Sequence, residues 1–203
     1  MIFNWWRMFL VSFLGACLGF SVSAGAEEVG KTTKSPTLSK FAVQLTVPYF
    51  KQETSSLCGL AVVQMICDYY KQKLNQTQKD WLKTIAKSEE GLAGSELVSV
   101  LRAADYYTAV FPGTLEGKKT GLYYHLDKKR PVIVMISSKD GKNSHYDVVT
   151  GYDAKQSLLL MMDPASGPIT VSTSDFSGAW KRANCFTLLA MPRKQVEAKT
   201  PTP

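Results

Sequence analysis

Apolar residues recur at helical spacing in the first half of the chain and at strand spacing in the second. The first predicted helix covers Cys58 to Lys73, and the second runs from Thr77 through Ile85. A near capping box over Thr77 to Asp80 is expected to start the second helix. A third helix is expected from Gly94-Ser95, with Ser95 as its N-cap.

Beyond the third helix, strands predominate, with two short helices expected over 122–127 and 172–180. The predicted strands are Phe41–Val47, Thr108–Phe111, Pro131–Ser137, Ser144–Tyr152, Ser157–Asp163, Ile169–Val171 and Asn184–Met191. Helices that precede a run of turn-linked strands indicate the α+β class. We therefore expect an N-terminal helical part packed on a C-terminal antiparallel sheet.

Composition divides the chain into four segments. Residues 1–26 have the pattern of a signal peptide, and polar residues 27–40 indicate a flexible linker. Residues 41–192 form one domain, which is long enough for its own core. Residues 193–203 are predicted to be a disordered tail.

The first segment predicts export. Arg7 is its only charge, an apolar run from Met8 to Val22 follows, and Ala24 to Ala26 gives a small-x-small cleavage pattern. Two alternatives remain open, an uncleaved membrane anchor and a lipoprotein whose Cys17 carries the lipid. The expected location is the periplasm or the outside of a bacterial cell, with a membrane contact only in those two cases.

The charge balance excludes several function classes. The chain carries 24 basic and 17 acidic residues, a formal charge of +7 that would become +6 without residues 1–26. Its lysines are scattered and no basic run is interleaved with aromatic residues, so no nucleic-acid partner is expected. Two histidines and no phosphate-binding glycine-rich loop indicate neither a metal nor a cofactor.

The strongest chemical signal is Cys58, which opens the first predicted helix with Gly59. A thiol at a helix N-terminus is exposed to the positive end of the helix dipole, which favours the nucleophilic thiolate. Gln52, six residues upstream, offers a side-chain amide for an oxyanion hole. This pattern predicts a cysteine nucleophile for acyl transfer.

A nucleophilic cysteine needs a base, and only His125 and His145 are available. His125 lies within a short predicted helix and is expected to be a partly exposed helical residue. His145 lies at the start of a strand, where a side chain can face a cleft. We therefore predict that His145 is the base.

Asp147, Asp153 and Asp163 are the candidates to orient His145. Asp147 lies two residues along the same strand, about 6.5 Å away, which is awkward for a hydrogen bond. A hairpin with its turn at residues 153–156 would instead place His145 opposite a position near 164. The hairpin therefore favours Asp163.

Two further cysteines, Cys67 and Cys185, have no place in this catalytic set. In an exported protein they are the candidate disulfide pair, because Cys58 and Cys67 point to opposite faces of one helix. Alternatively, both are small buried apolar residues without a bond.

Four motifs together resemble the papain-like peptidases typified by bacteriocin-processing, double-glycine leader peptidases. The motifs are Val47–Gln52, Cys58–Ala61, His145–Asp153 and Asp163–Gly167, within a resemblance over about residues 43–192. The resemblance implies a papain-like fold, with Cys58 as nucleophile and His145 as base. It also implies that Asp163 orients the base and that Gln52 contributes to the oxyanion hole.

These inferences predict an exported cysteine peptidase that hydrolyses a peptide or protein substrate through an acyl-enzyme on Cys58. Family members that process bacteriocins usually carry a transporter domain and an ATPase, so this chain is more similar to stand-alone exported members. A secretion system could deliver its substrate. The alternatives are an acyl transferase with the same thiol and a non-catalytic peptide-binding module.

Overall fold

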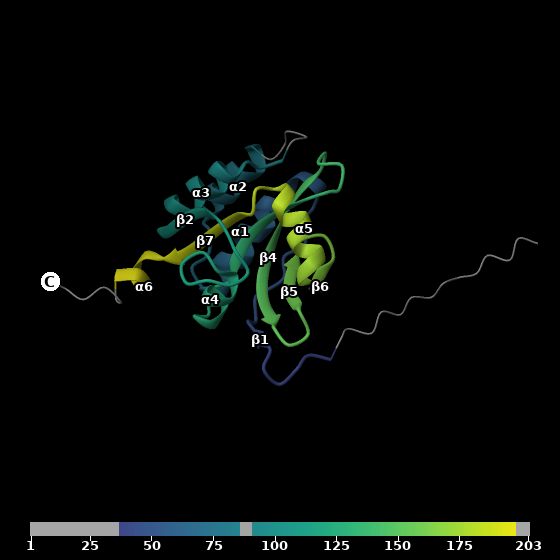
Figure 1. Ribbon diagram of the computed structural model, residues 1–203. Coiled ribbons are helices and arrows are strands. Elements are labelled where there is room, and N and C mark those ends of the chain that lie inside the picture. The colour runs from purple at the N-terminus through teal and green to yellow at the C-terminus, as the bar shows by residue number, and fades with distance from the viewer. Residues whose placement is uncertain (1–36, 86–90, 198–203) are drawn as a thin grey trace, which may run out of the picture. The chain divides into compact units, whose positions relative to one another are not determined.

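The computed structural model describes residues 37–85 and 91–197 (Figure 1). Its helices are α1 (Cys58–Tyr69), α2 (Gln76–Ile85), α3 (Gly94–Ala103), α4 (Leu122–Asp127), α5 (Thr173–Arg182) and α6 (Arg193–Glu197). A short 3-10 helix, Ser55–Leu57, immediately precedes α1. Its strands are β1 (Val43–Gln44), β2 (Tyr106–Pro112), β3 (Val132–Ser137), β4 (Ser144–Asp153), β5 (Leu158–Asp163), β6 (Gly167–Ser172) and β7 (Phe186–Pro192).

All the strands join one antiparallel sheet in the order β2-β7-β3-β4-β5-β6, and β1 adds to β4. The α+β prediction is therefore confirmed. Each predicted strand is present, although β1 pairs over two residues only.

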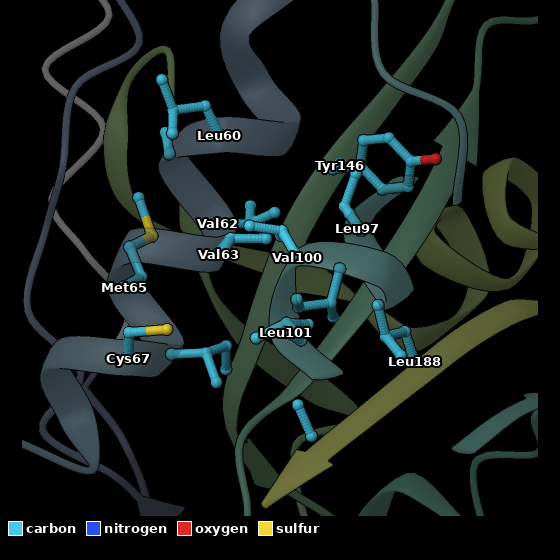
Figure 2. Close-up of a cluster of buried hydrophobic side chains, with 14 of the residues drawn as sticks. Leu60, Val62, Val63, Met65, Cys67, Leu97, Val100, Leu101, Tyr146 and Leu188 are labelled. Carbon is cyan, nitrogen blue, oxygen red and sulfur yellow. The ribbon is translucent and has the colours of Figure 1, made fainter. Parts of the chain in front are cut away.

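The sheet carries a separate apolar core on each face, because neighbouring residues of a strand point to opposite sides. Val148 of β4 belongs to the core built with α1 and α3, whereas Val149 belongs to the core built with α4 and α5. Figure 2 shows the first core, where α1 residues such as Val63 face Leu97 and Leu101 of α3. The helical part thus covers one face, and α4 and α5 cover the other.

The helix starts differ from those predicted. In α2 the capping pair is Asn75 and Gln78, each of which accepts the other's backbone N–H at 2.9 Å. In α3 the N-cap is Ala93, whose N–H donates to Glu96 at 2.7 Å, and Ser95 lies inside the helix. The reciprocal pair in α2 is a capping box, whereas α3 has only the half that Glu96 supplies, because the methyl group of Ala93 cannot accept a hydrogen bond.

Gly151 explains why β1 can join the sheet. Val43 pairs with Tyr152, and a Cβ atom on Gly151 would lie 2.2 Å from the carbonyl oxygen of Val43. Only glycine permits this approach of the two backbones. The chain before β1 is also attached, because the backbone N–H and hydroxyl of Ser39 both donate to Asp153.

The predicted boundary segments are partly described. Residues 37–40 of the linker contain the Ser39 contact, while residues 1–36, and with them the predicted signal peptide and Cys17, lie outside the described residues. The prediction of a disordered tail from residue 193 is wrong at its start, because Arg193–Glu197 is helical and Arg193 pairs with Asp105 at 3.5 Å. Residues 198–203 also lie outside the described part.

The three cysteines of the described residues, Cys58, Cys67 and Cys185, are all free thiols. Cys67 lies in the core with α1, whereas Cys185 packs against the core on the opposite face of the sheet. The disulfide alternative is therefore wrong, and Cys67 is a buried apolar residue. Within the described residues, no helix has the length and apolar character needed to cross a membrane.

Candidate active site

Cys58 is the first residue of α1 and is largely buried. Its neighbour Gly59 lets another segment approach the helix, because a Cβ at Gly59 would lie 3.0 Å from the Cβ of Leu92. The Cys-Gly pair therefore combines the dipole at a helix start with a close contact to the chain before α3.

The hairpin of β4 and β5 brings a histidine and a carboxylate together. Its turn is one residue later than predicted, since Asp153 pairs with Leu158, and a bulge at Thr150 then shifts the register by one. Past the bulge Val148 pairs with Met162. The predicted pairing is thus offset, yet the ends of the two strands still bring His145 next to Asp163.

His145 is bound on one side by a carboxylate and on the other by the thiol. Its Nε2–H donates to Oδ1 of Asp163 at 2.8 Å, which leaves Nδ1 as the ring nitrogen available to Cys58. Burial lowers the pKa of His145, but interaction with Cys58, the charge of Asp147 and the hydrogen bond to Asp163 raise it to about 9. The imidazolium form is therefore the stable one at neutral pH.

Asp163 is held as an ionised acceptor. Burial raises its pKa, but hydrogen bonds from the Ser166 hydroxyl, the Ala165 N–H and His145 lower the pKa below its usual range. The turn after β5 thus keeps the carboxylate charged and aimed at the histidine. The predicted choice of Asp163 agrees with this geometry.

Asp147 also reaches the histidine, which the strand spacing did not predict. Its Oδ1 lies 3.5 Å from Nε2 of His145 because the two side chains converge. The Asp147 side chain is only 1% exposed, and Oδ1 has no hydrogen-bond partner. Burial raises the pKa of Asp147 to about 7, with His145 acting in the opposite direction.

Gln52 is positioned through its backbone. Its N–H donates to the carbonyl of Pro164 at 2.9 Å, and the hydroxyl of Tyr49 donates to the same oxygen at 3.3 Å. These bonds tie the Gln52 segment to the residue after Asp163. Oε1 of Gln52 is buried and has no hydrogen-bond partner among the described residues, so no contact of that oxygen fixes the side-chain amide in another role.

The other candidates lie elsewhere. His125 is buried rather than partly exposed, because α4 packs its side chain inward, and its Nε2–H donates to the carbonyl of Lys119 at 3.0 Å. Burial lowers the pKa of His125. Asp153 accepts from Ser39 and from backbone N–H groups of the β4–β5 turn, so its role is to hold the turn.

A cavity of about 690 Å³ opens beside Cys58. One wall comes from Ser55 and from Glu96 of α3, and the other from Met135 and Tyr146 of the sheet. The sequence did not predict that these residues line a cavity, because their spacing along the helix and the strands is the same as that of residues packed in the core. Cys58 thus lines a cleft between the segment around α3 and the sheet.

Three potential metal-ligand side chains also meet at the site. Ligand atoms of His145, Asp147 and Asp163 lie within 4.8 Å of one another. The 2.8 Å hydrogen bond from Nε2 to Asp163 accounts for this proximity without an ion. The arrangement of nucleophile, base and orienting carboxylate needs no metal for acyl transfer.

Comparisons with known proteins agree with this geometry. The model of the family described as Peptidase_C39 like family matches residues 44–187. The mesentericin-Y105 transport/processing ATP-binding protein MesD of Leuconostoc mesenteroides is 28% identical over 141 residues, which is 69% of this chain. The match covers 18% of that relative, so this chain corresponds to a small part of it.

Two solved structures have the same fold. The peptidase domain of Streptococcus ComA, a bifunctional ABC transporter of a quorum-sensing pathway, has a TM-score of 0.57 at 19% identity, over 74% of this chain and 98% of that domain. A double-glycine motif protease from an AMS/PCAT transporter, solved with its leader peptide, has a TM-score of 0.56 at 20% identity, over 73% and 94%. With the family match, they place the chain in the Peptidase_C39 like family of cysteine peptidases, which have a papain-like fold.

Proposed function

We propose that this protein is an exported cysteine peptidase in which Cys58, His145, Asp163 and Gln52 carry out hydrolysis of a peptide bond. The observation that carries the proposal is the 2.8 Å hydrogen bond from His145 to Asp163, together with the effect of Cys58, which raises the pKa of the same ring. Nucleophile, base and orienting acid in this order are what acyl transfer requires. Membership of a peptidase family supports the same reaction.

The reaction begins with transfer of the thiol proton of Cys58 to Nδ1 of His145. The thiolate attacks the carbonyl carbon of the scissile bond, and the π electrons of that carbonyl move to oxygen. When the C–N bond breaks, His145 gives its proton to the leaving amine, and a thioester remains on Cys58. Water then attacks the thioester while His145 takes its proton, which releases the acid and restores the thiol.

Gln52 and the backbone N–H of Cys58 are assigned to the developing oxyanion. The bond from Gln52 N–H to Pro164 supports this assignment, because it holds the amide beside the turn that also carries Asp163. A positioned donor of this kind lowers the barrier by about 3 kcal/mol. Substitution of Gln52 by alanine should therefore lower kcat by roughly 100-fold and leave substrate affinity nearly unchanged.

The proposed substrate is an extended segment of a secreted peptide or protein, which a secretion system could deliver. A structural relative was solved with a leader peptide, and the 690 Å³ cavity beside Cys58 has room for several residues of such a segment. The first peptide to test is one with a Gly-Gly pair immediately before the bond to be cleaved.

The proposed location is the periplasm or the medium, which rests on the pattern of residues 1–26. Fractionation of producing cells, followed by intact mass of the protein, tests it. A mass that begins at residue 27 supports a cleaved signal peptide. A diacylated Cys17 would instead support a lipoprotein, and an intact N-terminus in the membrane fraction would support an anchor.

Thiol alkylation tests the catalytic assignment without a known substrate. We expect iodoacetamide at pH 6 to modify Cys58 at least tenfold faster than Cys185, and His145→Ala to abolish this difference. His125→Ala is the matched control and should leave the rate at Cys58 unchanged. Equal rates at Cys58 in the wild type and in His145→Ala would contradict the proposal.

Peptide libraries then separate the alternatives. A peptidase releases both fragments in water, and Cys58→Ala should bind the peptide without cleaving it. Product that forms only with an added amine acceptor would indicate an acyl transferase. Equal behaviour of wild type and Cys58→Ala in cells would indicate a binding module.

A further inference from the structure

Asp147 is a buried carboxylate that the proposed reaction leaves without a role. It lies on β4 between β3 and β5, with Val134 of β3 as its cross-strand neighbour. Its side chain is 1% exposed, and Oδ1 accepts no hydrogen bond. A buried carboxylate oxygen in this state costs stability, because it has lost water without gaining a donor.

Asp153 shows what a satisfied carboxylate on the same strand is like. It is fully buried as well, but it accepts hydrogen bonds from Ser39, from two backbone N–H groups of the turn and from the Gln156 amide. One strand thus carries one carboxylate that stabilises the fold and one whose oxygen faces only a histidine.

Among the described residues, His145 is the one group of opposite charge that pairs with Oδ1 of Asp147. That oxygen lies 3.5 Å from Nε2 of His145, the nitrogen that already donates to Asp163 at 2.8 Å. The groups that act on His145 are Cys58 on α1, Asp147 on its own strand and Asp163 on β5. Those that act on Asp147 are His145 and Asp163.

We propose that Asp147 is a positioning residue for His145, a second carboxylate whose charge holds the imidazolium while Asp163 orients its ring. The inference rests on the proposed role of His145 as the base. The two carboxylates differ in kind, since Asp163 makes the hydrogen bond and Asp147 acts on the same N–H by charge at longer range. Both favour the protonated ring.

This arrangement makes the support of His145 depend on pH near neutrality. The pKa of Asp147 is raised to about 7 by burial, so the carboxylate gains its charge as pH rises through that value. The imidazolium is thus held more firmly in alkaline solution, where it would otherwise lose its proton. Asp147 extends the pH range over which His145 keeps its proton.

Titration of His145 by NMR tests the proposal directly. The chain has two histidines, so ring signals are simple to assign, and His125 serves as an internal reference. We expect Asp147→Asn to lower the midpoint of His145 by about one unit or more and to leave His125 unmoved. Asp153→Asn is the matched control, a buried aspartate of the same strand, and should leave both midpoints unchanged.

Thermal unfolding separates positioning from a structural role. Burial of the Asp147 charge costs more than its pairing with His145 at 3.5 Å returns, so Asp147→Asn should raise the Tm at pH 8, whereas Asp153→Asn should lower it. Asp147→Val suits the strand and Val134, and it provides a second variant if the amide does not fold. A positioning residue is shown by a lower His145 midpoint in a protein that is at least as stable as the wild type.

An unchanged His145 midpoint in both Asp147 variants would overturn the inference. The titration needs no substrate, so it also distinguishes the two proposals. If His145→Ala fails to slow alkylation of Cys58 while Asp147→Asn lowers the midpoint, the charge coupling holds and the proposed reaction fails. If His145→Ala slows alkylation of Cys58 while the Asp147 variants leave the His145 midpoint unchanged, the proposed reaction holds and Asp147 has no part in it.

Discussion

Nε2 of His145 and Oδ1 of Asp163 lie 2.8 Å apart across two strands, although the residues are 18 positions apart in sequence. A turn and a single bulge determine how the strand ends meet. The contact fixes which ring nitrogen faces the thiol, because a ring that donates through Nε2 presents Nδ1 to Cys58.

Removal of the Asp163 charge should therefore impair catalysis more than folding. In Asp163→Asn the ring loses its anionic acceptor, and we expect kcat to fall roughly 100-fold or more with a small change in KM. Steady-state cleavage of a peptide substrate measures this. Asp127→Asn is the control. Asp127 accepts a hydrogen bond from Tyr152 of β4, away from the site, so this substitution should leave kcat within twofold.

Ser166 should set the acidic limit of activity. Burial raises the pKa of Asp163, and the Ser166 hydroxyl is foremost among the hydrogen bonds that lower it. Ser166→Ala should therefore raise the pKa of Asp163 and move the acid limb of kcat/KM to higher pH. Ser144→Ala, whose hydroxyl pairs with Ser137, should leave the acid limb in place. An unshifted limb in Ser166→Ala would disprove this assignment.

Folding stability should fall with rising pH because of His145. Its pKa is about 9 in the fold and about 6.5 in an unfolded chain, so the folded state holds an extra proton between these values. The stabilisation is complete below about pH 6.5 and is lost as pH rises through 9.

Urea unfolding at pH 6.5 and pH 9.5 measures this dependence. The wild type should lose on the order of 2 kcal/mol more than His145→Ala over that interval. His125→Ala should retain the wild-type loss, because burial lowers the pKa of His125 and the folded state therefore holds no extra proton on this ring. Equal losses in wild type and His145→Ala would mean that the ring is not held as the cation.

Gly151→Ala should detach β1. The new Cβ would lie 2.2 Å from the carbonyl oxygen of Val43, and backbone atoms cannot yield without separating the strands. We expect a loss of about 1–3 kcal/mol and faster proteolysis before Val47. Gly178→Ala is the control, since its Cβ meets only Arg182 at 3.7 Å and should not destabilise the protein. Similar melting of both variants would argue against this packing.

Much of the fold could be predicted from the sequence because its signals are local. The strand Pro131–Ser137 and the helix over Leu122–Asp127 follow from apolar runs and turn residues, and both are present within one residue of the expected bounds. The cap of α2 was misplaced because Asn75 and Thr77 are both good caps, and the choice depends on which side chain meets its partner.

The candidate site also contains features that could be predicted from the sequence and features that could not. Residue type and order were enough to propose Cys58 and His145, since few chemical groups can fill those roles, whereas the choice of Asp163 among three aspartates needed the expected hairpin. The contact of Asp147 could not be predicted, because the strand rise gives the spacing of Cα atoms and not the convergence of side chains. The burial of His125 depends likewise on how α4 meets the sheet.

The order of Cys58 and the β4–β5 hairpin along the chain has a consequence for how the protein is made. Cys58 lies on a helix that is synthesised well before β4 and β5, and its thiol has no base until those strands pair. An unfinished or unfolded chain therefore carries an ordinary cysteine. If the proposed site is active, pairing of β4 with β5 is the step that completes it, so its activity would depend on a folded sheet and not on removal of a separate inhibitor.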